Sequence, residues 1–572
     1  MVGARMKRIW GMWDGEGLLR VAMGVLCFFV LLIGVAGAQE TQENAVGEAV
    51  SAGSEPAVET AVEPAVIVGV VRIETVEVTG NTLIGSEEIA GVLKGLLPME
   101  GILSSGGSGG SLEKLPEAVT GLYRSKGYFL VQAYLPEQEI KDGVLKVKVL
   151  EGALGRVTVS GNDVYATLFI RNHFKEEGDT GLQRAGMERA LLLLNDYMDM
   201  KATGLFETGR EEGRADLNVR VTDERPLHFR FDYNNFGSKL VSRHRFGIGM
   251  DMGNVVRTGS VLSIRSVVGS PVTQAVYGSA GYSLPLDFNG TRLAMHLSGG
   301  DFDIGKSLAV LNIGMETMGW GVSVSHPIRK SSVATLVGEV GFDAQDFSQS
   351  FGVSGEKTRD RVRKLWGQMD YSKQRGRGRD ILGVSLHQGL GGVLGGTTAK
   401  QGGSRVGANN SFTRGVLEAA RFQEVTEMIS VMVRGVGQGS LNDLVVGEQM
   451  SLGGPDSIRG YAVGEFLGDS GYSFHAEMRV MPLKARDVMQ VVFFADHGDG
   501  YIKKGVSPLK GSLSGAGFGV RSHLTKEKSG VGVEGKKKLW DADVRADVGY
   551  PLRDGPYTKV GAAYYLQALL RY

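Results

Sequence analysis

The last nine residues, Tyr564-Tyr-Leu-Gln-Ala-Leu-Leu-Arg-Tyr572, form the stretch that decides how the second part of this chain is interpreted. In an extended strand successive side chains point to opposite faces. One face would then carry only apolar or aromatic residues, namely Tyr564, Leu566, Ala568, Leu570 and Tyr572. We therefore expect the chain to end in a β-strand whose apolar face has an aromatic side chain at each end.

The same period-two pattern recurs throughout the 347 residues from Pro226 to Tyr572. Clear examples are Phe229–Tyr233, Phe246–Met252, Phe474–Val480 and Ala542–Tyr550. Such alternation fits a soluble antiparallel sheet with one wet face, or a membrane barrel that is apolar toward lipid and polar toward its lumen. Asp543, Arg545 and Asp547 occupy successive positions of one polar face, which suits a water-filled lumen better than the core of a sandwich.

The start of the chain indicates export. A basic segment at residues 5–8 is followed by the apolar run Val21–Val35 and by Ala36-Gly37-Ala38, which fits the small-residue rule for signal cleavage. We predict a signal peptide over residues 1–38, cleaved at the Ala36/Ala38 motif. Because no later apolar run approaches 18 residues, any membrane-spanning part must be a closed barrel of strands. The aromatic-ended last strand is typical of bacterial outer-membrane barrels.

Composition excludes several classes of function. Lys+Arg and Asp+Glu are 63 each, so the formal net charge is zero, and we expect no nucleic-acid partner. Gly makes up 86 of 572 residues, roughly twice the usual ~7%, but without a collagen period. The single cysteine, Cys27, lies in the predicted signal peptide. We therefore expect no disulfide, no Cys-bound metal and no thiol nucleophile in the mature protein, and we predict no cofactor.

Before the alternating region, the chain repeats itself. Val76-Glu-Val-Thr-Gly-Asn81 recurs 81 residues later as Val157-Thr-Val-Ser-Gly-Asn162. Each copy opens a β-α-α-β-β pattern, which predicts two small α+β units over 67–152 and 153–225. The elements expected in them are strands at Arg72–Val78, Phe129–Leu135, Val144–Leu150, Val157–Val159 and Ala215–Val221, and helices at Ser86–Leu96, Leu115–Tyr123 and Met187–Leu194. Residues 39–66, rich in Glu, are expected to be an acidic linker, and Ser104–Ser111 a flexible loop.

Three local motifs suggest chemistry that their surroundings do not support. Gly300–Ser307 matches the phosphate-loop pattern, but a strand pattern follows it where a helix is required. Gly468-Asp469-Ser470-Gly471 resembles a serine-protease segment without a suitable histidine context. Asp496-His497-Gly498-Asp499 is a weak candidate for holding a cation. We interpret all three as structural and predict that the protein is not an enzyme.

The loop Gly453–Tyr461 is a better functional candidate. It precedes the strand Phe474–Val480, and a further strand carries Phe494-Ala495-Asp496. If the loop folds into a polar lumen, Arg459 would find a natural partner in Asp496, and such a shielded pair is stronger than an exposed one. The alternative is an outward loop with a solvated Arg459. Spacing alone favours that alternative.

Taken together, these motifs resemble the outer-membrane transporters of two-partner secretion, which are relatives of the barrel-assembly proteins with periplasmic POTRA domains. The resemblance covers nearly the whole mature chain. It is carried by Val76–Asn81, Tyr123-x-x-x-Gly127-Tyr128, Ala133-x-Leu135-Pro136 and Asp142–Gly152 for a first POTRA domain, and by Val157–Asn162 through Arg225-Pro226 for a second. Ile458-Arg459-Gly460-Tyr461 is similar to the family's Val-Arg-Gly-Tyr/Phe loop signature, and Phe494-Ala495-Asp496 to its F-x-D strand motif.

The resemblance implies two periplasmic POTRA domains (67–152 and 153–225) and a C-terminal transmembrane antiparallel β-barrel over 226–572. The barrel would have sixteen strands, although spacing alone also allows fourteen or eighteen. It implies that the loop near 453–461 folds into the barrel, that Arg459 meets Asp496, and that Tyr564, Leu566, Leu570 and Tyr572 form the terminal-strand assembly signal. The function implied is transport of one large exoprotein, such as an adhesin, haemagglutinin or haemolysin, across the outer membrane without ATP, with the POTRA domains binding that partner.

Two other functions stay open at this stage. An outer-membrane assembly or insertion factor of the same superfamily would typically carry more than two POTRA units. A passive porin would lack both the repeats and the Arg459 loop. The chain departs from the family pattern in residues 39–66, where no plug helix is recognisable.

Overall fold

The computed structural model describes residues 67–572 except 105–110, 176–181, 212, 306–308, 311, 400, 402, 483–487, 503–508 and 530–535. The predicted signal peptide (1–38, with Ala36 and Ala38), the acidic linker (39–66) and most of the Ser104–Ser111 loop lie outside the described residues. Within the described ranges, no helix is both long and apolar enough to span a membrane.

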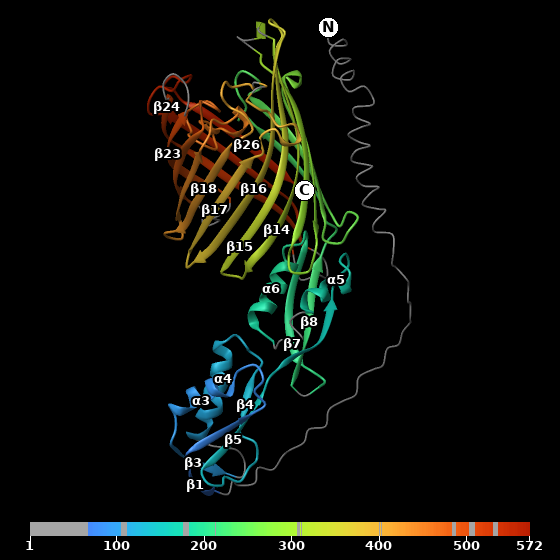
Figure 1. Cartoon of the computed structure of the whole chain (residues 1–572), viewed down its shortest axis with the longest axis vertical. Helices are drawn as coiled ribbons and strands as arrows, with labels where there is room; N and C mark the ends of the chain where they lie inside the picture. The colour runs from blue at the N-terminus through green and yellow to red at the C-terminus, as the bar shows by residue number, and fades with distance from the viewer. Residues whose placement is uncertain are drawn as a thin grey trace. The chain divides into compact units, whose positions relative to one another are not determined.

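The first repeat unit is a three-stranded sheet covered by two helices (Figure 1). Its strands are β2 (Thr75–Thr79), β5 (Val144–Leu150) and β4 (Gln132–Tyr134), in that order, and its helices are α3 (Ser86–Lys94) and α4 (Lys114–Ser125). β2 runs parallel to β5, and β4 runs antiparallel to it. The apolar faces of α4 and β5 meet in the core, where Leu115, Tyr123 and Leu145 are fully buried. An additional pair joins β1 (Ile67–Ile73) to β3 (Met99–Ser104).

The second repeat unit has the same strand order. Its sheet is β6 (Ala153–Ser160), β8 (Arg214–Asp223) and β7 (Met200–Thr208), and its helices are α5 (Thr167–Arg171) and α6 (Arg184–Leu194). β6 is parallel to β8, and β7 is antiparallel to it. Leu194, Leu217 and Val219 lie at the centre of its core.

The repeated Gly-Asn pair forms the same turn in both units. Gly80 and Gly161 have φ of +85° and +79°, and a Cβ on either would lie 2.4 Å from a backbone oxygen of the central strand. Glycine is therefore the residue that fits. The following Asn81 and Asn162 each donate a side-chain hydrogen bond to the start of the next helix, to Ser86 and Thr167. The textual repeat is thus a repeated strand-to-helix connection.

Sixteen strands of the described residues close into an antiparallel barrel, which confirms the expected fold class. They are β9 (Leu227–Asn234), β10 (His244–Gly253), β11 (Val261–Ser270), β12 (Ala275–Pro285), β13 (Arg292–Asp303), β14 (Ile313–Lys330), β15 (Ala334–Phe351), β16 (Glu356–Arg375), β17 (Gly378–Gly389), β18 (Thr413–Glu424), β19 (Ile429–Ser440), β22 (Ser470–Val480), β23 (Gln490–Ile502), β24 (Leu509–Ser529), β25 (Lys536–Pro551) and β26 (Ala563–Arg571). Closed pairing gives every strand a hydrogen-bonded neighbour on both sides, as a barrel in a bilayer requires.

The alternation in sequence is the alternation between the two faces of the barrel wall. On β22, Phe474 and Met478 are 46% and 42% exposed, whereas His475 and Glu477 between them are buried. On β10, Phe246 and Ile248 are exposed and Gly247 and Gly249 are buried. Because the apolar residues face outward, the outer surface suits lipid and the polar residues line the interior.

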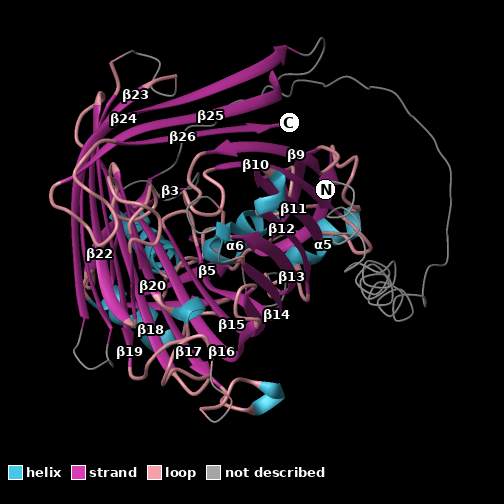
Figure 2. Ribbon diagram, turned by 90° about the horizontal axis from the view of Figure 1, so that it is seen from above, coloured by secondary structure: helices cyan, strands magenta, loops and turns pink. Residues whose placement is uncertain are grey.

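The terminal strand closes the barrel against the first one. β26 pairs antiparallel with β9, from Gln567–Asn234 to Arg571–Arg230 (Figure 2). The amides and carbonyls of Tyr572 and Phe229 then exchange two hydrogen bonds of 2.9 Å. The side chains of Tyr564, Leu566, Leu570 and Tyr572 are all exposed on the outer face, so the last residue of the chain still takes part in closure.

Some elements differ from the sequence prediction. The strand expected at Arg72–Val78 is split, because β1 ends at Ile73 and β2 begins at Thr75. The strand expected at Phe129–Leu135 is only Gln132–Tyr134. The sequence predicts no separate range for α5 or β7. In β7 only Met200 and Ala202 are buried, so the alternation is too short to predict a strand there.

Candidate functional site

The loop between β19 and β22 folds into the barrel. β19 is the eleventh strand, so it runs in the same direction as β9 and ends at the opposite end of the barrel from the start of β9. Within the loop, β20 (Met450–Leu452) and β21 (Phe466–Gly468) form a short hairpin. The residues at its tip are buried, with Ile458 at 0%, Arg459 at 3% and Tyr461 at 1% exposure. An outward loop with a solvated Arg459 is therefore not the observed conformation.

Apolar packing holds the body of this infolded loop, residues 450–468, against the wall. Leu452, Ile458, Tyr461 and Phe466 form one buried cluster with Leu513 of β24. The wall strands carry glycine where the loop comes closest. A Cβ on Gly511 would lie 2.3 Å from the Phe466 ring, and one on Gly500 would lie 2.6 Å from it. The glycine content of these strands therefore makes room for the loop inside the barrel.

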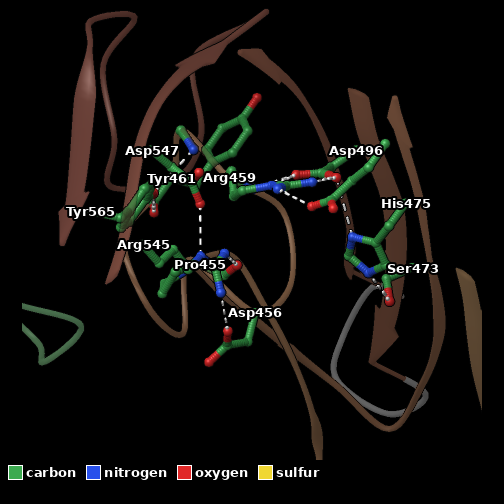
Figure 3. Close-up of polar contacts among 12 residues, drawn as sticks. Pro455, Asp456, Arg459, Tyr461, Ser473, His475, Asp496, Arg545, Asp547 and Tyr565 are labelled. Atoms are coloured by element: carbon green, nitrogen blue, oxygen red, sulfur yellow. Dashed lines mark hydrogen bonds and ion pairs between the residues drawn. The ribbon is translucent and has the colours of Figure 1, made fainter. Parts of the chain in front are cut away.

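Arg459 and Asp496 form a bidentate ion pair (Figure 3). The guanidinium Nε donates to Asp496 Oδ2 at 2.6 Å and Nη2 donates to Oδ1 at 2.7 Å. The backbone amide of Arg459 also donates to Asp496 Oδ2, at 3.1 Å. Phe494, two residues before Asp496 on β23, places its ring 3.5 Å from the guanidinium carbon. Both residues of the F-x-D motif thus contact the same arginine, one by charge and the other by its ring face.

A second carboxylate completes the contacts of Arg459. Glu477 on β22 accepts from Nη1 at 2.6 Å and is itself 6% exposed. It also accepts from Arg479 at 2.9 Å. The sequence alone does not predict Glu477 as a partner of Arg459. It lies on the polar face of Phe474–Val480, but only the strand register, which pairs His475 with Asp496, brings that face to Arg459.

Ser473, His475 and Asp496 are connected in the order of a hydrolase triad. Ser473 Oγ lies 3.2 Å from His475 Nε2, and His475 Nδ1 lies 3.2 Å from Asp496 Oδ1 (Figure 3). Asp496, however, already binds Arg459 through both oxygens, and Ser473 is only 5% exposed. This chain of hydrogen bonds is therefore suited to orienting Asp496 toward Arg459.

The other side of the loop tip contacts β25 and β26. Arg545 donates to the Pro455 carbonyl at 2.7 Å and to Asp456 at 3.1 Å. The Tyr565 hydroxyl accepts from the Gly460 amide at 3.0 Å and donates to the Tyr461 carbonyl at 2.8 Å. The last strand thus holds the backbone of the Ile458–Tyr461 motif directly.

The backbone of Arg459 and Gly460 touches the wall. A Cβ on Gly515 of β24 would lie 1.9 Å from the Arg459 carbonyl oxygen, and one on Gly549 of β25 would lie 2.7 Å from the Gly460 nitrogen. Gly460 itself has φ of +103° and lies against Tyr550 and Pro551. The motif needs glycine at this position for both its conformation and its clearance.

The three other motifs of the sequence analysis have structural positions. Gly300–Asp303 ends strand β13, so the first half of the phosphate-loop match is extended. Asp496–Asp499 lies within β23, where Asp499 contacts Lys510 at 3.2 Å. Gly468–Gly471 joins β21 to β22, and its Asp469 is fully buried.

One group of described residues has the chemistry of metal ligands. The ligand atoms of His523, Asp541 and Asp543 lie within 4.8 Å of one another. Arg571 pairs with both carboxylates, at 2.6 Å from Asp543 and also in contact with Asp541. The cluster is therefore already neutralised in part by the chain's own cation.

Comparison with known proteins gives concordant results. The family described as "Haemolysin secretion/activation protein ShlB/FhaC/HecB" matches residues 213–522, and "POTRA domain, ShlB-type" matches residues 71–152. A heme/hemopexin transporter protein, HuxB, of Haemophilus influenzae (strain 86-028NP) is 22% identical over 438 residues, which cover 76% of each chain. An outer membrane transporter, CdiB, of Dickeya dadantii (strain 3937) is 22% identical over 434 residues, covering 72% of this chain and 74% of the relative.

Solved structures show the same fold. CdiB from Escherichia coli superimposes with a TM-score of 0.71 at 18% identity, covering 88% of this chain and 91% of that one. CdiB from Acinetobacter baumannii gives a TM-score of 0.63 at 15% identity, covering 96% and 98%.

Proposed function

Because this chain belongs to the haemolysin secretion/activation protein family ShlB/FhaC/HecB, and is thus an outer-membrane pore that translocates a secreted exoprotein, we propose that the infolded loop sets the resting shape of its lumen. The POTRA region of the family is periplasmic, so the start of β9 marks the periplasmic end of the barrel. The loop then enters the lumen from the surface end. Arg459 is the residue that we expect to hold it there.

The buried Arg459–Asp496 pair is the observation that supports this proposal most directly. Glu477 and Asp496 are 6% and 3% exposed. If Arg459 left, bulk water could not solvate either carboxylate in its place without a large free-energy cost. Removing one partner from a buried pair typically costs ~3–5 kcal/mol. A partner chain that enters the lumen must therefore either displace the loop, which breaks this pair, or pass beside it.

We further propose that the repeat units bind the unfolded start of the exoprotein by adding its strand to a sheet edge. In each unit the strand that opens the repeat, β2 or β6, lies at the edge of its sheet. Strand addition provides affinity through backbone hydrogen bonds with little demand on sequence. Folding of the exoprotein at the surface would then drive transport, since the periplasm offers no ATP. An adhesin, haemagglutinin or haemolysin is the class of partner we expect.

Two experiments test the proposal. Arg459→Ala should leave the barrel assembled but impair export of the exoprotein in a surface-display assay. Arg434→Ala, which removes another wall arginine paired to Glu418 at 2.7 Å, is the matched control and should export normally. Deletion of 67–225 should abolish binding of the partner's N-terminal segment while leaving a conducting pore in planar bilayers. Normal export by the Arg459 variant would exclude the proposed role of the loop.

A further inference from the structure

The base of the infolded loop carries a second buried ionic cluster that the family motif does not include. Glu448, just before β20, is 1% exposed. Its Oε1 accepts from Lys364 of β16 at 2.7 Å, and its Oε2 pairs with Arg414 of β18 at 2.9 Å. One carboxylate of the loop is thus held between cations from two strands of the wall.

Asp469 forms the matching contact just after β21. It is fully buried and receives Arg405, whose Nη2 lies 2.8 Å from Oδ2. The amide of Leu444 and the side chain of Gln449 donate to its Oδ1 at 3.0 and 3.2 Å. Gln438 of β19 then joins the two halves, because its amide donates to the carbonyls of both Glu448 and Asp469, at 3.1 and 3.2 Å. Both ends of the hairpin are fixed at one place.

Arg405 belongs to a second surface-end loop, residues 390–412 between β17 and β18. That loop is itself packed against the projecting part of β16. Asn410, which is 0% exposed, exchanges hydrogen bonds of 3.1 Å with the backbone of Arg363, and Thr397 accepts from the Arg361 amide at 2.7 Å. Phe412 and Ala408 share a buried cluster with Leu444 and Val445, which precede Glu448. The two loops therefore form one packed layer.

We propose that Glu448 and Asp469 are positioning residues that form a second anchor of the infolded loop, and that this anchor couples its movement to the 390–412 loop. The tip anchor at Arg459 uses strands β22 and β23, beside the hairpin, whereas the base anchor reaches β16 and β18. Release of the tip alone leaves the hairpin held at its base. Displacement of the whole loop breaks the contact between Asp469 and Arg405, and so removes an interaction that holds the 390–412 loop.

This inference deepens the proposed function and rests on it only for the role of the loop in transport. The position of the loop is measurable without any exoprotein. Ile458 at the tip is fully buried, and the chain's single cysteine is Cys27. Ile458→Cys therefore introduces a reporter at the tip, with the parent chain as the blank. Labelling in intact cells by a membrane-impermeant maleimide reports how often the tip is exposed.

In the Ile458→Cys background, the double variant Glu448→Gln/Asp469→Asn removes the base charges with little change of shape. We expect its labelling to rise about tenfold, which corresponds to ~1.4 kcal/mol. Asp232→Asn is the matched control, because it removes a buried carboxylate that pairs with Arg265 at 2.9 Å on strands outside the loop contacts. Its labelling should stay at the level of the background.

Unchanged labelling of the double variant, or an equal rise with Asp232→Asn, would overturn the inference. Heat-modifiable migration in gels checks that each barrel is folded. If the double variant does not fold, Arg405→Ala decides the question, because it removes the partner of Asp469 without changing the hairpin; labelling at background level would then refute the coupling. Failure of the proposed function is separate, because normal export by Arg459→Ala leaves the labelling result unaffected.

Discussion

Two parts of the molecule use a carboxylate to hold a loop, but they give it different partners. In the barrel, Asp496 binds the guanidinium of Arg459. In the first repeat unit, Glu151 binds the backbone, accepting from the amides of Thr82 and Leu83 at 2.8 and 2.9 Å. In the second unit Asp223 does the same for the amides of residues 163–165, at 2.8 to 3.0 Å.

The two kinds of contact differ in whether the segment they hold can move away from the carboxylate. The amides that Glu151 and Asp223 bind belong to short strand-to-helix connections. The side chains of Asn81 and Asn162 also fix these connections, through hydrogen bonds to the start of the next helix. The Arg459 loop instead lies inside the barrel against its wall, and it is held by charges on strands that pair with their neighbours without it. We infer that Glu151 and Asp223 serve the folding of the repeat units, whereas Asp496 and Glu477 select between positions of the infolded loop.

Gly515→Ala is the substitution with the largest expected effect on the position of the infolded loop. The new Cβ would lie 1.9 Å from the Arg459 carbonyl oxygen, a backbone atom that cannot rotate away. Overpacking typically costs ~1–3 kcal/mol, and here the loop can avoid the clash only by leaving the wall. We expect export to fall at least about tenfold while the barrel still assembles. Gly437→Ala, which meets no atom within 4 Å, is the control; an equal loss there would show that the wall, and not the loop, is affected.

Removing the amide-binding carboxylates should instead loosen the repeat units. Glu151→Ala leaves two backbone amides and the Tyr123 hydroxyl without their acceptor. A hydrogen bond to a charged group contributes ~1.5–3 kcal/mol, so the turn at 82–83 should lose protection in hydrogen–deuterium exchange of the full-length protein. The barrel strands should keep their protection. Asp223→Ala should have the same effect on residues 163–165, and loss of barrel protection in either variant would contradict the division of roles.

The sequence could predict the repeat units and the barrel wall because both are local patterns. Val76–Asn81 and its copy predict a turn that needs glycine. The alternation along Phe474–Val480 predicts a strand with one face toward lipid and one face toward the lumen. Partners across strands are different. The residues alone suggest Asp496 as a partner of Arg459, but only the family resemblance favours that pair over an outward loop. Glu477, Tyr565 and the base contacts of Glu448 depend on strand register and on the path of the loop inside the barrel. Neither of these leaves a periodic signal in the sequence.

The repeat units also differ from the barrel in their predicted response to acid. Burial alone would raise the pKa of Glu151, but hydrogen bonds from Thr82, Tyr123 and the amides of Leu83 and Thr82 outweigh it and lower the pKa. A lowered folded pKa means that this stabilisation is complete above the unfolded value of about 4.3 and is lost as the pH falls through the folded value. Protection of residues 82–83, corrected for intrinsic exchange, should therefore decline in acid. Glu151→Gln should remove that pH dependence; its persistence would assign it to another group.

The smallest effect is expected from Phe494→Leu. Leucine keeps the apolar volume beside Arg459 but removes the ring face that lies 3.5 Å from the guanidinium carbon. Cation–π contacts contribute ~0.5 kcal/mol when exposed and ~2 kcal/mol when desolvated, and the bidentate pair with Asp496 remains. We expect slightly faster maleimide labelling at Ile458→Cys and nearly normal export. Because Phe494 lies on the same strand as Asp496, this variant separates the two halves of the F-x-D motif. A loss of export as large as that of Arg459→Ala would mean that the ring, and not the charge, holds the loop.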